Sequence, residues 1–153
     1  MRLRLAAWSG VLLLLAGCAE SPFTPSEMHQ ARRALARWEG RGFTDYRFEF
    51  RAACFCPPEL NQWAEIEVRG GVVVAARSVD TGDSFTGSQL IMWRTIEAHF
   101  EDLFRERDDT GLTNITARFD PMLGNPIHID YTYDPGIMDA GAGLYFRNVA
   151  PLD

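Results

Sequence analysis

The feature that most constrains this chain is a series of short runs in which apolar side chains alternate with polar ones. Alternation at period two places every second side chain on one face of a strand, so each run predicts a half-buried β-strand. Turn-forming Gly, Pro, Asp and Ser separate the runs, and Gly70-Gly71 is typical of a hairpin. Two further strands are predicted beside turns although their residues do not strictly alternate, namely Val72–Val79 and Leu144–Val149. The six predicted strands are Tyr46–Ala52, Ala64–Arg69, Val72–Val79, Thr113–Asp120, Ile127–Tyr133 and Leu144–Val149.

A first helix is predicted ahead of these strands. Thr24 can cap it, Pro25 suits the first helical position, and Glu27 completes a capping box. The helix ends at Gly40-Arg41-Gly42. Its apolar side chains recur at helical spacing and share one face: Met28, Ala31, Leu35 and Trp38.

A second helix is predicted between the third and fourth strands. It begins at Gln89 or Thr95 and continues to Arg107. Ile96, Phe100, Leu103 and Phe104 form its apolar stripe. The side chains assigned to the solvent side are Glu97, Glu101, Arg105 and Asp108.

The predicted order is therefore α-β-β-β-α-β-β-β. Strands joined by short turns, with only two helices, favour an α+β fold in which an antiparallel sheet of about six strands carries both helices on one face. We expect one domain over residues 24–153. We also interpret the two α-β-β-β units as an internal duplication, although residue identity between the halves is slight.

The N-terminus has the pattern of a lipoprotein signal peptide over residues 1–17. A basic start, Met1-Arg2-Leu3-Arg4, precedes an apolar run that is shorter than the roughly 20 residues of a transmembrane helix. The run ends in Leu15-Ala16-Gly17-Cys18, which predicts cleavage before Cys18 and lipidation of its thiol. The alternative is an ordinary secretory signal followed by a chance cysteine.

Lipidation would place the chain in the bacterial envelope. Two or three acyl chains, such as palmitate, anchor a protein stably, and residues 18–23 would form a short tether. Ala19 is not the aspartate that commonly retains lipoproteins in the inner membrane. In an organism with two membranes we therefore expect the outer membrane, facing the periplasm.

The charge balance argues against a nucleic-acid partner. All 15 basic residues are arginines, and losing Arg2 and Arg4 with the signal takes the formal net charge from −6 to −8. Nucleic-acid binding needs a basic surface, which an acidic domain lacks. The composition also predicts no polybasic patch for anionic lipid, so the expected membrane contact is the lipid itself.

Cys54 and Cys56 remain after lipidation of Cys18, in the sequence Cys54-Phe55-Cys56-Pro57-Pro58. A structural disulfide is the simplest outcome in an oxidising envelope. Side chains two residues apart on a flat strand are about 6.5 Å apart, so a disulfide requires the chain to bend. The alternatives are a strained redox-active dithiol, a metal site completed by His99 or His128, and free buried thiols.

No other motif predicts a catalytic or cofactor site. Asp130, Asp134 and Asp139 could supply oxygens to calcium, but they lack the regular spacing of a calcium loop and are typical turn residues. Gly82-Asp83-Ser84 resembles the nucleophile block of some esterases, without the supporting oxyanion and acid–base residues. We therefore expect no enzyme activity, no metal and no cofactor.

Several of these elements together resemble a known family. They are Trp38, the strand Tyr46-Arg47-Phe48, the Cys54–Pro58 segment, and the block from Asp120-Pro121 through Gly124 to Asp130. From about Trp38 to Pro151 the chain resembles a family of uncharacterised bacterial lipoproteins described only as a domain of unknown function. Its Cys-x-Cys-Pro element is the most specific part. The resemblance implies fold and location, and no activity.

Two functional hypotheses follow. The first is a lipid-anchored, non-enzymatic module that binds another envelope component through an exposed sheet face or edge. The second is a periplasmic thiol-disulfide or metal-handling protein that acts through Cys54 and Cys56. A periplasmic enzyme inhibitor is a third hypothesis, which rests on analogy of fold alone.

Overall fold

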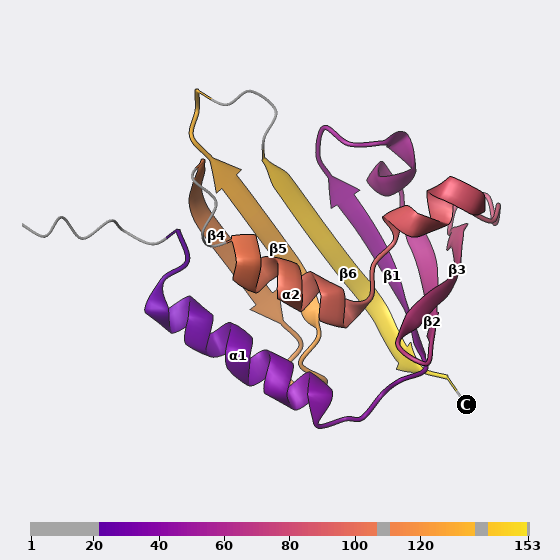
Figure 1. Cartoon of the computed structure of the whole chain (residues 1–153), viewed down its shortest axis with the longest axis horizontal. Helices are drawn as coiled ribbons and strands as arrows, with labels where there is room; N and C mark the ends of the chain where they lie inside the picture. Colours follow the sequence, from indigo (N-terminus) through magenta and orange to yellow (C-terminus); the bar gives the residue numbers. More distant parts are fainter. Residues whose placement is uncertain (1–21, 107–110, 137–140, 153) are drawn as a thin grey trace, which may run out of the picture.

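The strands form one six-stranded sheet, and Figure 1 shows the helices packed against it. The structure is a computed structural model, and it describes residues 22–106, 111–136 and 141–152. Cys18 and the predicted signal peptide therefore lie outside the described residues. The elements, in chain order, are α1 (Pro25–Glu39), β1 (Tyr46–Ala53), η1 (Pro58–Asn61), β2 (Ala64–Arg69), β3 (Val72–Ser78), η2 (Gly87–Met92), α2 (Ile96–Glu106), β4 (Leu112–Phe119), β5 (Pro126–Tyr133) and β6 (Ala142–Pro151).

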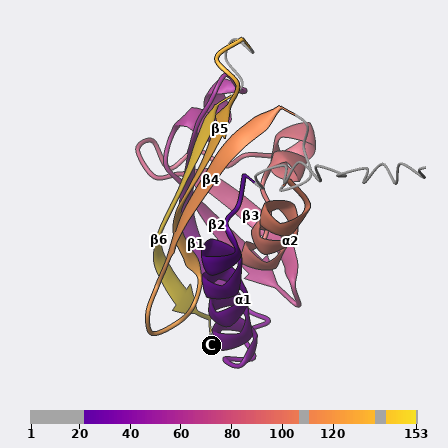
Figure 2. The same ribbon diagram turned by 90° about the vertical axis from the view of Figure 1, so that its left-hand side faces the viewer.

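The predicted fold class is confirmed. The sheet order is β3-β2-β1-β6-β5-β4, and every neighbouring pair is antiparallel. Figure 2, which views the sheet nearly edge-on, shows α1 and α2 on the same face. Apart from the two short 3₁₀ helices η1 and η2, the order of elements is the predicted α-β-β-β-α-β-β-β. None of the helices in the described ranges is long and apolar enough to span a membrane.

The interpretation as an internal duplication is wrong. The first meander starts at β1 in the sheet centre and moves outward to β3, whereas the second starts at the edge strand β4 and moves inward to β6. Pairing through β5 and β6 makes β4 antiparallel to β1. The second unit can be turned within the plane of the sheet until β4 lies on β1 and points the same way, with the helices still on the same face. After this rotation β5 and β6 extend to one side of that strand, whereas β2 and β3 extend to the other side. The two units therefore have opposite hands, which copies of one unit would not.

Local sequence signals explain where the helices begin. The Thr24 hydroxyl accepts a hydrogen bond from the Glu27 amide at 3.3 Å, and the Glu27 carboxylate accepts one from the Thr24 amide at 3.0 Å, so the predicted capping box is present. The second helix begins at Ile96, with the Thr95 hydroxyl accepting from the amide of Ala98. The alternative start at Gln89 is wrong, because that segment forms η2 and the chain is extended at the buried Trp93.

The core lies between the helices and the inner face of the sheet. The alternating side chains of the strands point inward as predicted, and aromatic rings pack edge to face or stacked across the layer. Gly124, in the β4–β5 turn, lets α1 approach, because an added Cβ would lie 2.3 Å from the carbonyl oxygen of Ala34. The largest fully buried side chains include Trp38, Tyr46, Phe48, Ile66, Ile96, Phe100, Leu103, Ile115 and Ile129.

Glu97 is not on the solvent side, as the helical pattern predicted, but joins three elements. Its carboxylate accepts hydrogen bonds from the indole of Trp38 at 2.7 Å and from the phenol of Tyr46 at 2.5 Å. The Tyr46 oxygen in turn accepts from the amide of Ile96 at 3.0 Å. Burial, and then the bonds to Glu97, raise the pKa of Tyr46 far above its ordinary value, so the phenol stays protonated and donates.

We expect Glu97→Leu to lower the free energy of unfolding by about 3 kcal/mol. The change leaves two buried donors, on Trp38 and Tyr46, without an acceptor, and each unsatisfied donor costs about 1–3 kcal/mol. Denaturant unfolding measures the effect. Glu101→Leu, at an exposed position of the same helix, is the matched control and should change stability by less than about 0.5 kcal/mol. Equal losses in both variants would contradict the role of this network.

Candidate functional site

A pocket opens between α2 and one end of the sheet. Its volume is about 290 Å³, which suits an aromatic ring or a short branched chain. Its walls come from β1, β5, β6, η1, η2 and α2, so distant parts of the chain meet there. The lining residues are Phe50, Ala52, Cys54, Leu60, Met92, Arg94, His99, Asp102, Tyr131, Tyr133, Ala142 and Leu144.

Most of the lining is apolar or aromatic, and its charged groups are confined to α2 and the residues before it. The side chain of Arg94 pairs with Asp102 in a bidentate arrangement, with N···O distances of 2.9 and 3.2 Å. Asp102 also accepts a hydrogen bond from Arg105. The Arg94 side chain is 45% exposed, so this end of the pair faces solvent. The Asp102 carboxylate is bound by both Arg94 and Arg105. The pocket is thus apolar inside with a charged pair in its wall.

His99 is the titratable group most altered by this environment. It is buried, with its ring stacked on Phe50 at 4.9 Å and edge-on to Phe146 at 4.9 Å. Burial, and to a smaller extent the positive charge of Arg94, lowers the pKa of His99 to about 3. The imidazole is therefore neutral at physiological pH. It presents one donor and one acceptor nitrogen among aromatic rings, which is a suitable lining for a polar group of a bound ligand.

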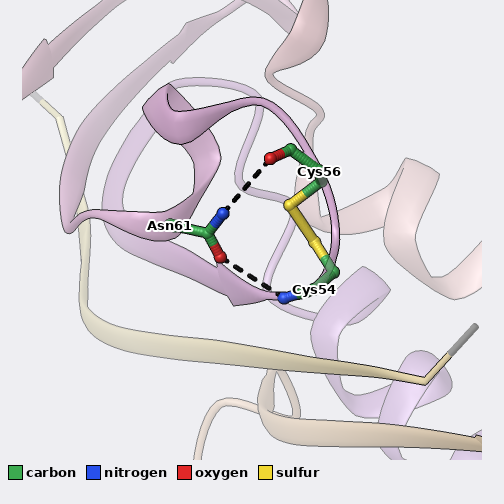
Figure 3. Close-up of a disulfide and its surroundings, with 3 residues drawn as sticks. All are labelled: Cys54, Cys56 and Asn61. Carbon is green, nitrogen blue, oxygen red and sulfur yellow. Dashed lines mark hydrogen bonds between the residues drawn. A yellow bond between two sulfur atoms is a disulfide. The ribbon is translucent and has the colours of Figure 1, made fainter. Parts of the chain in front are cut away.

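Cys54 and Cys56 form a disulfide beside this pocket. Their Cα atoms are 5.2 Å apart, closer than on a flat strand, so the chain bends there as the sequence required. Figure 3 shows how Asn61 supports the bend: its amide oxygen accepts from the Cys54 amide and its amide nitrogen donates to the Cys56 carbonyl, both at 3.3 Å. Phe55, between the two cysteines, is 87% exposed. The bridge therefore shapes one side of the pocket.

The two histidines proposed as metal ligands lie on opposite faces of the sheet. His99 is on α2, whereas His128 stacks on Tyr145 at 4.5 Å on the face away from the helices. His128 can therefore not join the Cys54–Cys56 pair, which lies beside the pocket on the helix face. Within the described ranges, no three His, Cys, Asp or Glu side chains come together as a metal site would require.

The remaining acidic and loop candidates have structural partners. Asp130 lies 3.1 Å from the His128 imidazole, and the Asp134 carboxylate accepts from the Gly136 amide within a turn. Asp139 lies outside the described residues. The Gly82-Asp83-Ser84 segment is a loop beside β3, bridged to it by backbone pairing of Ser84 with Arg77. None of the described side chains among these candidates lines the pocket.

The sheet face away from the helices is lined by charged and aromatic side chains that bind one another. The guanidinium of Arg51 lies 5.0 Å from the Tyr145 ring centroid and 5.4 Å from that of Trp63. Arg147 lies 3.8 Å over Trp63 and pairs with Glu49 at 2.6 Å. The guanidinium groups of two arginines therefore contact the Trp63 ring on this face.

Comparison with known proteins identifies the family and no activity. The model of a family described as "Family of unknown function (DUF6174)" matches residues 30–151. The chain belongs to this family. The matched range begins within α1 and includes every residue of the pocket lining. No curated protein and no solved structure matches the chain. The resemblance drawn from the sequence is confirmed as far as a family of unknown function.

Sequence reasoning missed the pocket itself. It named His99 only as a possible metal ligand, and it considered Cys54 as a disulfide, redox or metal-binding cysteine but not as part of a pocket. Arg94, Asp102 and Leu60 were not singled out at all, although all three line the pocket. No local motif could have found them, because the lining is assembled from separate segments. The available signal was indirect: a histidine one residue before the apolar Phe100, on the buried side of an amphipathic helix.

We expect acid to destabilise the protein through His99. The folded state keeps His99 neutral down to its pKa of about 3, whereas the unfolded chain takes up a proton near pH 6.5. Stability is therefore present above pH 6.5 and falls by about 1.4 kcal/mol per pH unit below it, or about 2 kcal/mol by pH 5.

Urea unfolding of wild type and His99→Gln between pH 7 and pH 5 measures this contribution. The variant should lose stability less steeply than wild type over that interval. His29→Gln, which removes an exposed histidine from α1, is the control and should keep the wild-type slope. Identical slopes for wild type and His99→Gln would show that His99 does not resist protonation.

Proposed function

We propose that this chain is a lipid-anchored lipoprotein of the bacterial envelope whose domain binds a small amphipathic ligand in the pocket beneath α2. The pocket carries the proposal: its interior is apolar and aromatic, and the Arg94–Asp102 pair stands in its wall with the neutral His99 nearby. The apolar part of the ligand occupies the space between Phe50, Tyr131 and Leu144. Its polar end contacts Arg94 or His99.

The envelope location is supported by the sequence. The run Leu15-Ala16-Gly17-Cys18 follows a basic start and an apolar segment, and Cys18 is four residues before the first described residue, Pro22. The Cys-x-Cys-Pro element, which we propose as a family feature, forms the bend beside the pocket in this chain. In a two-membrane organism the domain faces the periplasm from the outer membrane. We propose a binding role and no catalytic one.

We expect intact mass spectrometry of the protein isolated from membranes to give a chain that begins at Cys18 and carries acyl chains. Alkylation before reduction should add nothing, and reduction should expose two thiols, because Cys54 and Cys56 are bridged. Cys18→Ala should move the protein out of the membrane fraction. An unacylated mass would overturn the anchor. Two thiols that alkylate without reduction would instead favour the thiol-disulfide or metal-handling alternative.

We expect Ala142→Phe to block ligand binding by filling the pocket, which Ala142 lines at the start of β6. The probe is 1-anilinonaphthalene-8-sulfonate, whose rings suit the aromatic interior and whose sulfonate suits the guanidinium of Arg94. Fluorescence titration should show the dissociation constant rising at least about tenfold, which corresponds to about 1.4 kcal/mol.

The matched control is Ala75→Phe, which places the same ring at an exposed position of β3 away from the pocket. It should bind the probe as wild type does. Equal binding by both variants would locate the probe elsewhere. A wild-type protein that gives no fluorescence enhancement would overturn the pocket as a site for an aromatic anion.

A further inference from the structure

A second groove, with a basic lining, lies between α1 and the edge strand β4. It has a volume of about 460 Å³ and is separate from the pocket beneath α2. The polar residues of its lining are Gln30, Arg33 and Arg37 on α1 and Arg118 on the edge strand β4. Arg33 and Arg37 are four residues apart, so they lie on the same side of the helix. Figure 2 views the molecule from this side, with α1 and β4 facing the reader.

Within the part of the chain that the structure describes, no acidic side chain neutralises these three arginines. No Asp or Glu lines the groove, and among the described residues no carboxylate lies within ion-pair distance of Arg33, Arg37 or Arg118. This distinguishes them from Arg69, Arg77 and Arg147, each of which pairs with an acid on the sheet. Three positive charges that lack an acidic partner among the described residues thus lie at one edge of an acidic chain, which makes this edge complementary to an anionic surface.

Apolar side chains accompany these charges. Ala34, Phe119 and Ile127 form the rest of the groove lining with Ala117, and Ile127 is 37% exposed. The β4–β5 turn adds Met122, which is 69% exposed and whose carbonyl accepts a hydrogen bond from Arg41. Arginines interspersed with exposed apolar side chains are typical of surfaces that lie at the headgroup level of a bilayer.

The chain also brings this edge close to the proposed anchor. The carbonyl of Pro22 accepts a hydrogen bond from the Ile115 amide on β4 at 2.8 Å, and Phe23 is buried in the core. Cys18 precedes Pro22 by four residues, which span at most about 14 Å. Arg118 is three residues from Ile115, or about 10 Å along the strand. The groove therefore lies within reach of a bilayer that holds Cys18.

We infer that the α1–β4 groove is a binding surface for the phosphate headgroups of anionic phospholipid and holds the domain edge-on against the bilayer. Its placement at the membrane rests on the lipid anchor of the proposed function, whereas its affinity for anionic lipid does not. This revises the expectation from composition, which predicted no basic patch for lipid. The net charge is a sum over the whole chain and does not report where the arginines gather.

The test uses the whole mature chain, residues 18–153, with Cys18→Ser, which removes the anchor and keeps every described residue. Cosedimentation with vesicles of phosphatidylcholine containing about one third phosphatidylglycerol should capture the protein, and pure phosphatidylcholine vesicles should not. Binding should weaken as salt is raised from low ionic strength to about 0.5 M, because surface charges are then screened. Since this chain carries no lipid, the result is independent of whether Cys18 is acylated in the cell.

The decisive variant is Arg33→Gln with Arg118→Gln, which removes one charge from each side of the groove at exposed positions. Each arginine near an anionic bilayer is worth about fivefold in affinity, so the pair should weaken binding about 25-fold. The control is Arg69→Gln with Arg77→Gln, on β2 and β3 toward the opposite edge of the sheet from β4. It changes the net charge by the same amount and should leave binding to the vesicles nearly unchanged. Equal losses in both double variants, or equal capture by neutral and anionic vesicles, would overturn the inference.

Discussion

The arrangement of the whole helix layer depends on the carboxylate of Glu97. From α2 it holds the indole of Trp38 on α1 and the phenol of Tyr46 on β1, and that phenol also receives the amide of Ile96 at the start of α2. One group thereby fixes the two helices and the central part of the sheet relative to one another. A charged acceptor shared by two buried donors is stronger than neutral bonds and geometrically more specific than apolar packing. The pocket beneath α2 and the groove beside α1 both depend on helix positions that this network sets.

Much of the fold could be predicted because strand alternation and helix capping are local properties. The predicted strands, the capping box at Thr24 and the bend at Cys54–Cys56 all depend on residues close together in the chain. Glu97 could not be placed in this way. It follows Ile96 at the margin of the apolar stripe of α2, where the helical pattern alone places it in solvent. Glu97 is partly buried because Trp38 on α1 and Tyr46 on β1 pack against it, and their positions do not follow from the sequence of α2. The order of elements likewise carries no information about the hand of the second meander.

The pocket and the groove could not be predicted from the sequence, for two different physical reasons. The pocket lining comes from strands, two short helices and α2, and no spacing rule connects Leu60 with Asp102 or Tyr133. The basic groove could not be predicted from the net charge, because that sum over the whole chain does not report where arginines gather. Arg33 and Arg37 are ordinary residues for an exposed helix, and only the fold brings Arg118 near them. Both surfaces lie on the side of the sheet that carries the helices or at its edge. The opposite face offers less, because Arg51 and Arg147 are already engaged with Trp63, Tyr145 and Glu49.

The pairing of β1 with β6 sets the order in which the sheet can be completed. Among the described strands β1 is made first and β6 last, and they are neighbours at the centre of the sheet. While the chain is being synthesised, β1 and β5 each keep one unpaired edge, although each can already pair with its neighbour in sequence, β2 or β4. The middle of the sheet closes only when Ala142–Pro151 arrives. Until the residues of β6 have emerged, a nascent chain therefore exposes two strand edges that a second copy could pair with.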